Sequence, residues 1–73
     1  MKAKVRIDTF SDALTFVNIA STLDGRITIT DNAGLCVSAK SLLGVLYSIE
    51  FSELWCESDK DIRSRISAFI VND

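Results

Sequence analysis

The chain has 73 residues, of which 48% are hydrophobic, and its 8 basic and 10 acidic side chains give a formal net charge of -2. This length allows one domain, residues 1–73, and this apolar content is normal for a folded domain rather than a disordered chain. Proteins that bind nucleic acid carry a basic field, which this charge does not supply, so we expect no nucleic-acid partner.

The few metal-binding and nucleophilic side chains argue against a structural zinc site and against cysteine catalysis. Histidine is absent, and the two cysteines are Cys36 and Cys56. Two thiols alone cannot complete a structural zinc site, and no imidazole can activate a cysteine nucleophile. The chain opens on no leader peptide and has no apolar run of about 18 residues. We therefore expect a cytoplasmic protein outside the membrane, which is not an enzyme and needs no metal or other cofactor.

The first predicted elements are a strand and a helix. Residues 2–7 alternate polar and apolar side chains, which is the period of a half-buried strand. Residues 12–22 change to the period of a helix with one apolar face. Ser11 or Asp12 can cap the first amides of this helix, and the Asp-Gly pair at residues 24–25 can end it.

A hairpin is predicted next. Residues 26–30 and 35–39 both alternate, and the Asp-Asn-Ala-Gly sequence between them, residues 31–34, has the composition of a turn. Two alternating runs around a short turn pair as antiparallel strands.

The remaining sequence predicts a helix, a strand and a helix. Residues 41–48 are nearly all apolar, as in a short helix that lies on a sheet, and residues 52–56 follow as a fourth strand. Beyond Ser58, apolar side chains recur at intervals of four, three and one, which predicts a third helix with one apolar stripe. That stripe consists of Ile62, Ile66, Phe69 and Ile70.

These elements follow the order β-α-β-β-α-β-α, and each has one apolar face. The arrangement that buries all of these faces is an α+β sandwich of two layers, with three helices on one face of a four-stranded sheet. The other face of the sheet stays open.

Residues 39–46, Ala-Lys-Ser-Leu-Leu-Gly-Val-Leu, resemble the second-helix signature of the HPr family, the histidine phosphocarriers of the sugar phosphotransferase system. Phe16-Val17 followed by Ala20-Ser21 is similar to the family's first helix. The resemblance implies an HPr-like open-faced sandwich with an antiparallel sheet in the order 1-4-2-3. The element order alone also fits a ferredoxin-like domain, so the second-helix motif separates the two folds.

The sequence departs from the family at the phosphotransfer loop. Where the family has a Gly-Leu-His-Ala-Arg-Pro-like loop, residues 8–12 read Asp-Thr-Phe-Ser-Asp. Without histidine the family's reaction is excluded, and Asp12 would repel a phosphate. The resemblance therefore implies an HPr-like protein without phosphocarrier activity, which serves as a regulatory or protein-interaction module related to the phosphotransferase system.

Ser41 matches the family's regulatory serine, and the resemblance implies a phosphorylation switch at this residue. A phosphate at the amino end of a helix is stabilised by the free amides and the helix dipole. The alternative is that Ser41 is simply a helix cap, because serine is among the preferred residues at that position.

The second helix also carries the candidate docking patch, which in the family contacts partner proteins. The matching residues are Lys40, Leu42, Leu43 and Leu46. Core packing is the alternative role for some of these leucines, although a short helix cannot bury every side. The implied partners are components of the phosphotransferase system or a transcription regulator, and a homodimer is the other predicted assembly.

Trp55 is a separate candidate for a contact surface. It alternates with Leu54 and Cys56, so if these face the helices, Trp55 faces outward from the open side of the sheet. The alternative is a tryptophan shielded by the stems of nearby basic side chains, which are Lys4, Arg6 and Arg26. Cys36 should lie on the open face and Cys56 in the core, so no disulfide is expected.

Two other functions stay open. One is a small-ligand-binding regulatory domain of ferredoxin-like type, which would need a concave pocket at a sheet edge or dimer interface. The other is a structural remnant that has no dedicated partner.

Overall fold

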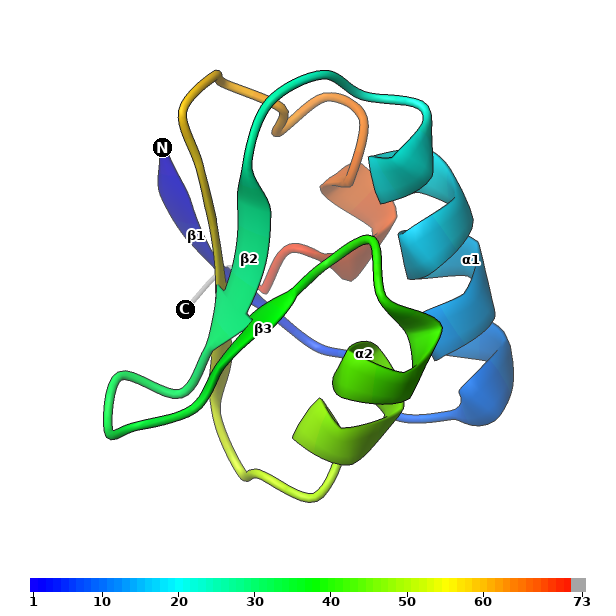
Figure 1. Ribbon diagram of the computed structural model, residues 1–73, viewed down its shortest axis with the longest axis vertical. Coiled ribbons are helices and arrows are strands. Elements are labelled where there is room, and N and C mark those ends of the chain that lie inside the picture. The colour runs from blue at the N-terminus through cyan, green and yellow to red at the C-terminus, as the bar shows by residue number, and fades with distance from the viewer. Residues whose placement is uncertain (72–73) are drawn as a thin grey trace.

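The computed structural model describes residues 1–71, which form one sheet layer and one helical layer (Figure 1). The elements are β1 (Lys2–Val5), α1 (Phe10–Ser21), β2 (Ile27–Thr30), β3 (Cys36–Ser38), α2 (Leu42–Ser48), β4 (Leu54–Ser58) and the 3-10 helix η1 (Ser67–Phe69). All strand pairs are antiparallel and the order is β1-β4-β2-β3, which confirms the predicted sheet. None of the helices within residues 1–71 is long and apolar enough to cross a membrane.

The helices all lie on one face of the sheet, and the core lies between them and the sheet (Figure 1). Cys56 of β4 has Ala3 of β1 on one side and Ile29 of β2 on the other. Cys56 and Ile29 are fully buried, as are Phe16 of α1 and Val45 of α2. Burial of an aliphatic or aromatic side chain contributes about 1.5–3 kcal/mol relative to exposure. The alternation read from the sequence therefore identified the inner face of the sheet.

The predicted third helix is wrong, because the described chain has two α-helices and ends in turns and the three-residue η1. The inner members of the predicted stripe are nevertheless buried, namely Ile62, Ile66 and Phe69. The Asp61 carboxylate accepts a hydrogen bond from the Arg63 N–H at 3.1 Å. Such a local bond competes with the helical pattern, and buried anchors can stabilise turns as well as a helix. The spacing thus predicted burial correctly and the backbone incorrectly.

Every strand differs from the prediction at one or both boundaries, most clearly β1 and β4. β4 begins at Leu54 rather than at residue 52, because the turns that follow α2 use more of the chain. β1 ends at Val5 rather than at residue 7, although Ile7 is still buried.

The chain beyond η1 runs along the outer edge of β1. The Arg6 N–H donates to the Phe69 carbonyl at 2.9 Å, and the Val71 N–H donates to the Lys4 carbonyl at 2.9 Å. Between these bonds, Val5 and Ile70 form an antiparallel bridge. Residues 69–71, here called the C-terminal segment, therefore cover the edge of the sheet at β1.

Candidate functional site

The amino end of α1 corresponds in the sequence to the family's phosphotransfer loop, and it is closed by its own side chains. Thr9, rather than Ser11 or Asp12, is the N-cap, and its Oγ1 accepts from the Asp12 N–H at 3.0 Å. Asp12 Oδ2 in turn accepts from the N–H groups of Thr9 at 3.3 Å and Asp8 at 3.2 Å. This reciprocal capping box uses the amides of Asp8, Thr9 and Asp12, which could otherwise bind an anion. A phosphate here would displace the Asp12 carboxylate and approach that of Asp8.

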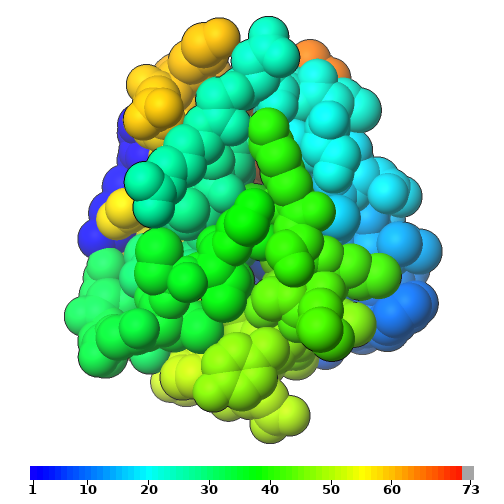
Figure 2. Space-filling view, in the orientation of Figure 1, coloured from blue at the N-terminus to red at the C-terminus, as the bar shows by residue number. Residues whose placement is uncertain are grey.

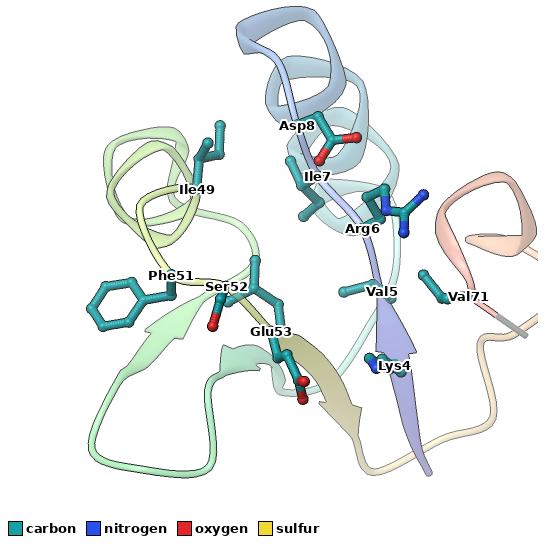
Figure 3. Close-up of a pocket in the computed structure, with 11 residues that line it drawn as sticks. Lys4, Val5, Arg6, Ile7, Asp8, Ile49, Phe51, Ser52, Glu53 and Val71 are labelled. Carbon is teal, nitrogen blue, oxygen red and sulfur yellow. The ribbon is translucent and has the colours of Figure 1, made fainter. Parts of the chain in front are cut away.

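A cleft of about 260 Å³ lies beside this end, where the chain before β4 diverges from the chain after β1 (Figure 3). Arg6 and Asp8 lie next to each other along one wall, and Glu53 comes from the opposite wall (Figure 3). Charges of both signs therefore face the cleft. Within residues 1–71, no group of three or more Cys, Asp or Glu side chains is placed to hold a metal ion. The small-ligand function, which needs a concave pocket at a sheet edge or dimer interface, stays a prediction.

Ser41 lies at the amino end of α2 with an extended backbone, and its Oγ accepts from the Gly44 N–H at 3.2 Å. It is therefore the N-cap of α2, which is the simpler of the two predicted roles. Unlike α1, α2 has no acidic residue in its first turn. The Ser41 side chain is exposed, and its modification stays a prediction.

Lys40 is exposed, but its ammonium group already has partners within the chain. Its Nζ donates to the carbonyl oxygens of Leu23 at 2.7 Å and Gly25 at 3.0 Å. These carbonyls follow the carboxyl end of α1, where a cation is favourable. Lys40 thus ties the start of α2 to the end of α1, and a docking role for it stays a prediction.

The three candidate leucines of α2 differ in exposure. Leu42 and Leu46 are half-buried and pack against the core, whereas Leu43 is 80% exposed. Tyr47, one helical turn after Leu43, is 59% exposed. The sequence interpretation missed Tyr47, although the i, i+4 spacing from Leu43 could have identified it. We call Leu43 and Tyr47 the outer surface of α2.

Further exposed apolar side chains lie on α1. Phe10 is 58% exposed and Leu14 is 40% exposed, and they are again one helical turn apart. α1 and α2 pack against each other in the helical layer. The helical side of the molecule therefore carries more large exposed apolar side chains than the open face of the sheet, where Trp55 is half-buried.

Trp55 lies on the open face as predicted, opposite Lys4 on β1 and Thr30 on β2. The Nζ atoms of Lys2 and Lys4 each lie 5.9 Å from the centre of its ring. Lys2 also forms an ion pair with Glu57 at 3.4 Å. Basic side chains therefore shield the ring, although Lys2 was not among those predicted to do so. A contact role for Trp55 stays a prediction.

The cysteines lie where they were predicted. Cys36 is exposed, Cys56 is buried, and neither forms a disulfide. Burial raises the pKa of the Cys56 thiol to about 11. Cys56 is therefore neutral at physiological pH and unsuited to nucleophilic chemistry.

A comparison with solved structures finds a similar fold in the crystal structure of HPr-C-His from Thermoanaerobacter tengcongensis. The two chains are 24% identical with a TM-score of 0.66, and the match covers 93% of this chain and 84% of the other. No family model and no curated protein matches the sequence. The comparison and the strand order together show that the chain has an HPr-like fold.

Proposed function

We propose that this chain is an HPr-like protein without phosphocarrier activity, which acts as a regulatory protein-interaction module related to the phosphotransferase system. The outer surface of α2 carries the proposal, because Leu43 and Tyr47 are 80% and 59% exposed on one short helix. Large apolar side chains grouped in this way are typical of contact surfaces. The loss of phosphocarrier activity is supported by the absence of histidine and by the capping box at α1.

Ser41 is the proposed switch of this module. A phosphate there would add a charge of about -1.5 to -2 beside the outer surface of α2. The Gly44 amide, which now bonds to Ser41 Oγ, is a backbone donor within reach of it. Mass measurement of the protein isolated from its native host tests the switch. A Ser41 that is unmodified when sugar is in excess would contradict it.

Capture of partners from the native cytoplasm tests the docking role. We expect wild type to retain a phosphotransferase component or a transcription regulator, and Leu43→Asp to lose it, because the substitution places a carboxylate in an apolar contact. Leu14→Asp is the matched control, since Leu14 is an exposed leucine on α1. Leu46 is less suitable for substitution because it packs against the core. Recovery of the same proteins with all three chains would overturn the docking role.

A further inference from the structure

β3 is the outer strand on the side of the sheet opposite β1, and part of its backbone points away from the sheet. Ala39, which follows β3, donates its N–H to the Ile27 carbonyl at 2.9 Å. Backbone groups of an antiparallel strand alternate between its two sides, so those of Cys36 and Ser38 point away from β2. The Ser38 carbonyl already accepts from the Ser41 N–H at 3.1 Å, which leaves the N–H and C=O of Cys36 and the N–H of Ser38. Within residues 1–71, no strand lies beyond β3. The edge of the sheet is therefore open at the backbone of Cys36 and at the Ser38 N–H.

α2 packs beside this open edge. A Cβ atom placed on Gly44 would lie 3.1 Å from Cβ of Val37, so this face of α2 lies against β3. At 3.6 residues per turn, Tyr47 lies about 60° and Leu43 about 100° around the helix from Gly44, in the same direction. Figure 2 shows β3 and α2 together on the face turned toward the viewer. The open edge and the outer surface of α2 thus belong to one region, which we call the β3–α2 strip.

The β3–α2 strip carries no charge that would oppose its own copy. Its members are the backbone of Cys36 and Ser38 and the side chains of Leu43 and Tyr47. Exposed edge strands are commonly blocked by charged side chains or proline, and residues 35–39 contain neither. Across a two-fold axis each patch meets itself, so like charges near the axis would repel. An uncharged strip with an antiparallel edge is compatible with such an axis.

We propose that the β3–α2 strip joins two copies of this chain. β3 of one copy pairs antiparallel with β3 of the other, and the two α2 helices meet through Leu43 and Tyr47. The inference rests on the proposed function, because it names the occupant of the outer surface of α2. Because each Ser38 carbonyl already bonds to Ser41, the free groups of two such strands form about two backbone hydrogen bonds, which places the contact in the small, weak class.

Sedimentation from about 10 µM to about 1 mM, the range expected of a weak interface, tests the association. Wild type should pass reversibly from monomer to dimer. Leu43→Asp should remain a monomer throughout, because it places two carboxylates near the axis, whereas Leu14→Asp on α1 should dimerise as wild type does. A monomeric wild type, or a dimer that Leu43→Asp leaves unchanged, would overturn the proposal. If Leu43→Asp loses its helical circular dichroism, Tyr47→Lys replaces it in the comparison.

Cross-linking through Cys36 tests the place of the contact. Cys36 is exposed beside the proposed axis and Cys56 is buried, so a short bismaleimide should link two chains through Cys36. The link should form in wild type at concentrations that give a dimer, and it should be lost in Cys36→Ser and Leu43→Asp. A sedimenting dimer that forms no link would overturn the β3 pairing.

The two proposals fail in different ways. A monomeric chain that captures another protein through Leu43 overturns the second copy and leaves the docking module in place. A dimer that is sensitive to Leu43→Asp supports the second copy as the occupant. A chain that neither dimerises nor captures a partner overturns both.

Discussion

The two edges of the sheet differ in what satisfies their backbone. At β1, the C-terminal segment exchanges hydrogen bonds with Lys4 and Arg6. At β3, the Ser38 carbonyl accepts from the Ser41 N–H, but the outward groups of Cys36 and the Ser38 N–H meet no further strand within residues 1–71. An open, uncharged edge is where another chain can add a strand. The difference indicates that this small fold protects one edge with its own chain and leaves the other available for association.

The cover at β1 depends on a buried anchor. Phe69 of η1 places its ring 5.1 Å from that of Phe16, edge to face, and its carbonyl accepts from Arg6. In the predicted third helix, Phe69 and Ile70 would have been helical, and a helical backbone could not pair with the edge of β1 as an extended segment does. Because η1 ends at Phe69 and Ile70 is extended, the chain after η1 can pair with β1.

The largest expected effect comes from Phe69→Ala, which removes this anchor. We expect the free energy of unfolding to fall by about 3–4 kcal/mol, because a buried phenylalanine is lost and a cavity is left against Phe16. Denaturant unfolding measures the loss. Phe10→Ala is the matched control, since Phe10 is 58% exposed, and it should cost far less. Equal losses in the two variants would show that the cover at β1 is not anchored by Phe69.

Cys56 lies at the centre of the sheet, away from both edges, and its contribution to the free energy of unfolding should depend on pH. Burial raises the pKa of Cys56 from the ordinary value of 9.0 to about 11. A raised pKa in the folded state means that the contribution to stability is full below pH 9 and is lost as the pH rises toward 11. The stability advantage of the parent over Cys56→Ala should shrink by about 2 kcal/mol across that window.

Urea unfolding at stepped pH measures this advantage, and the difference between the two chains cancels titrations that they share. Cys36→Ala is the control, because Cys36 is exposed and its removal should leave the pH dependence of the parent unchanged. An advantage of Cys56 that stays constant from pH 8 to 11 would contradict burial of the thiol at the centre of the sheet.

The open edge should respond to the turn that precedes β3, with a smaller effect. Asp31 Oδ1 accepts from the N–H groups of Ala33 and Leu35, each at 2.9 Å, and these bonds hold the pKa of Asp31 below its ordinary 3.8. A lowered pKa in the folded state means that the contribution is present above pH 3.8 and is lost as the pH falls below it. Asp31→Ala should therefore loosen the hairpin at neutral pH.

Amide hydrogen exchange across β2 and β3 measures the loosening. Asp31→Asn is the matched control, because it keeps an oxygen acceptor without a titrating group, so its hairpin should keep its protection and lose the acid dependence. Equal protection in Asp31→Ala and the parent would show that the turn does not hold β3 in place.

The sequence predicted which side of each element is buried better than it predicted the type and limits of the elements. Alternation around Ile29 and Cys56 identified the inner side of the sheet because a strand exposes its two faces in turn. Alternation cannot say which strands are neighbours, and the strand order came instead from the resemblance carried by residues 39–46. The prediction of a third helix was wrong because the spacing of buried side chains does not reveal local hydrogen bonds, such as the one that the Arg63 N–H donates to Asp61.

The candidate site was predicted in part, for a similar reason. Ser41 as a cap and the exposure of one or two leucines follow from local helix geometry, but the sequence did not identify Leu43 as the exposed one. The role of Lys40 does not, because the carbonyls of Leu23 and Gly25 reach its ammonium only after α1 and α2 have packed together. The capping box at α1 was within reach of the sequence, since Thr9 and Asp12 have the required spacing, but two other residues also fitted the cap.

Trp55→Ala should have the smallest effect on association, and it separates the open face from the open edge. Trp55 lies on β4, between β1 and β2, and the Nζ atoms of Lys2 and Lys4 approach its ring. If the two copies meet at β3, its removal leaves the contact intact, and the variant should sediment with the mass of the parent at every concentration. A variant that loses the dimer while keeping its circular dichroism would move the contact to the open face. In that case, the lysine side chains that shield Trp55 would move away from its ring when the two copies associate.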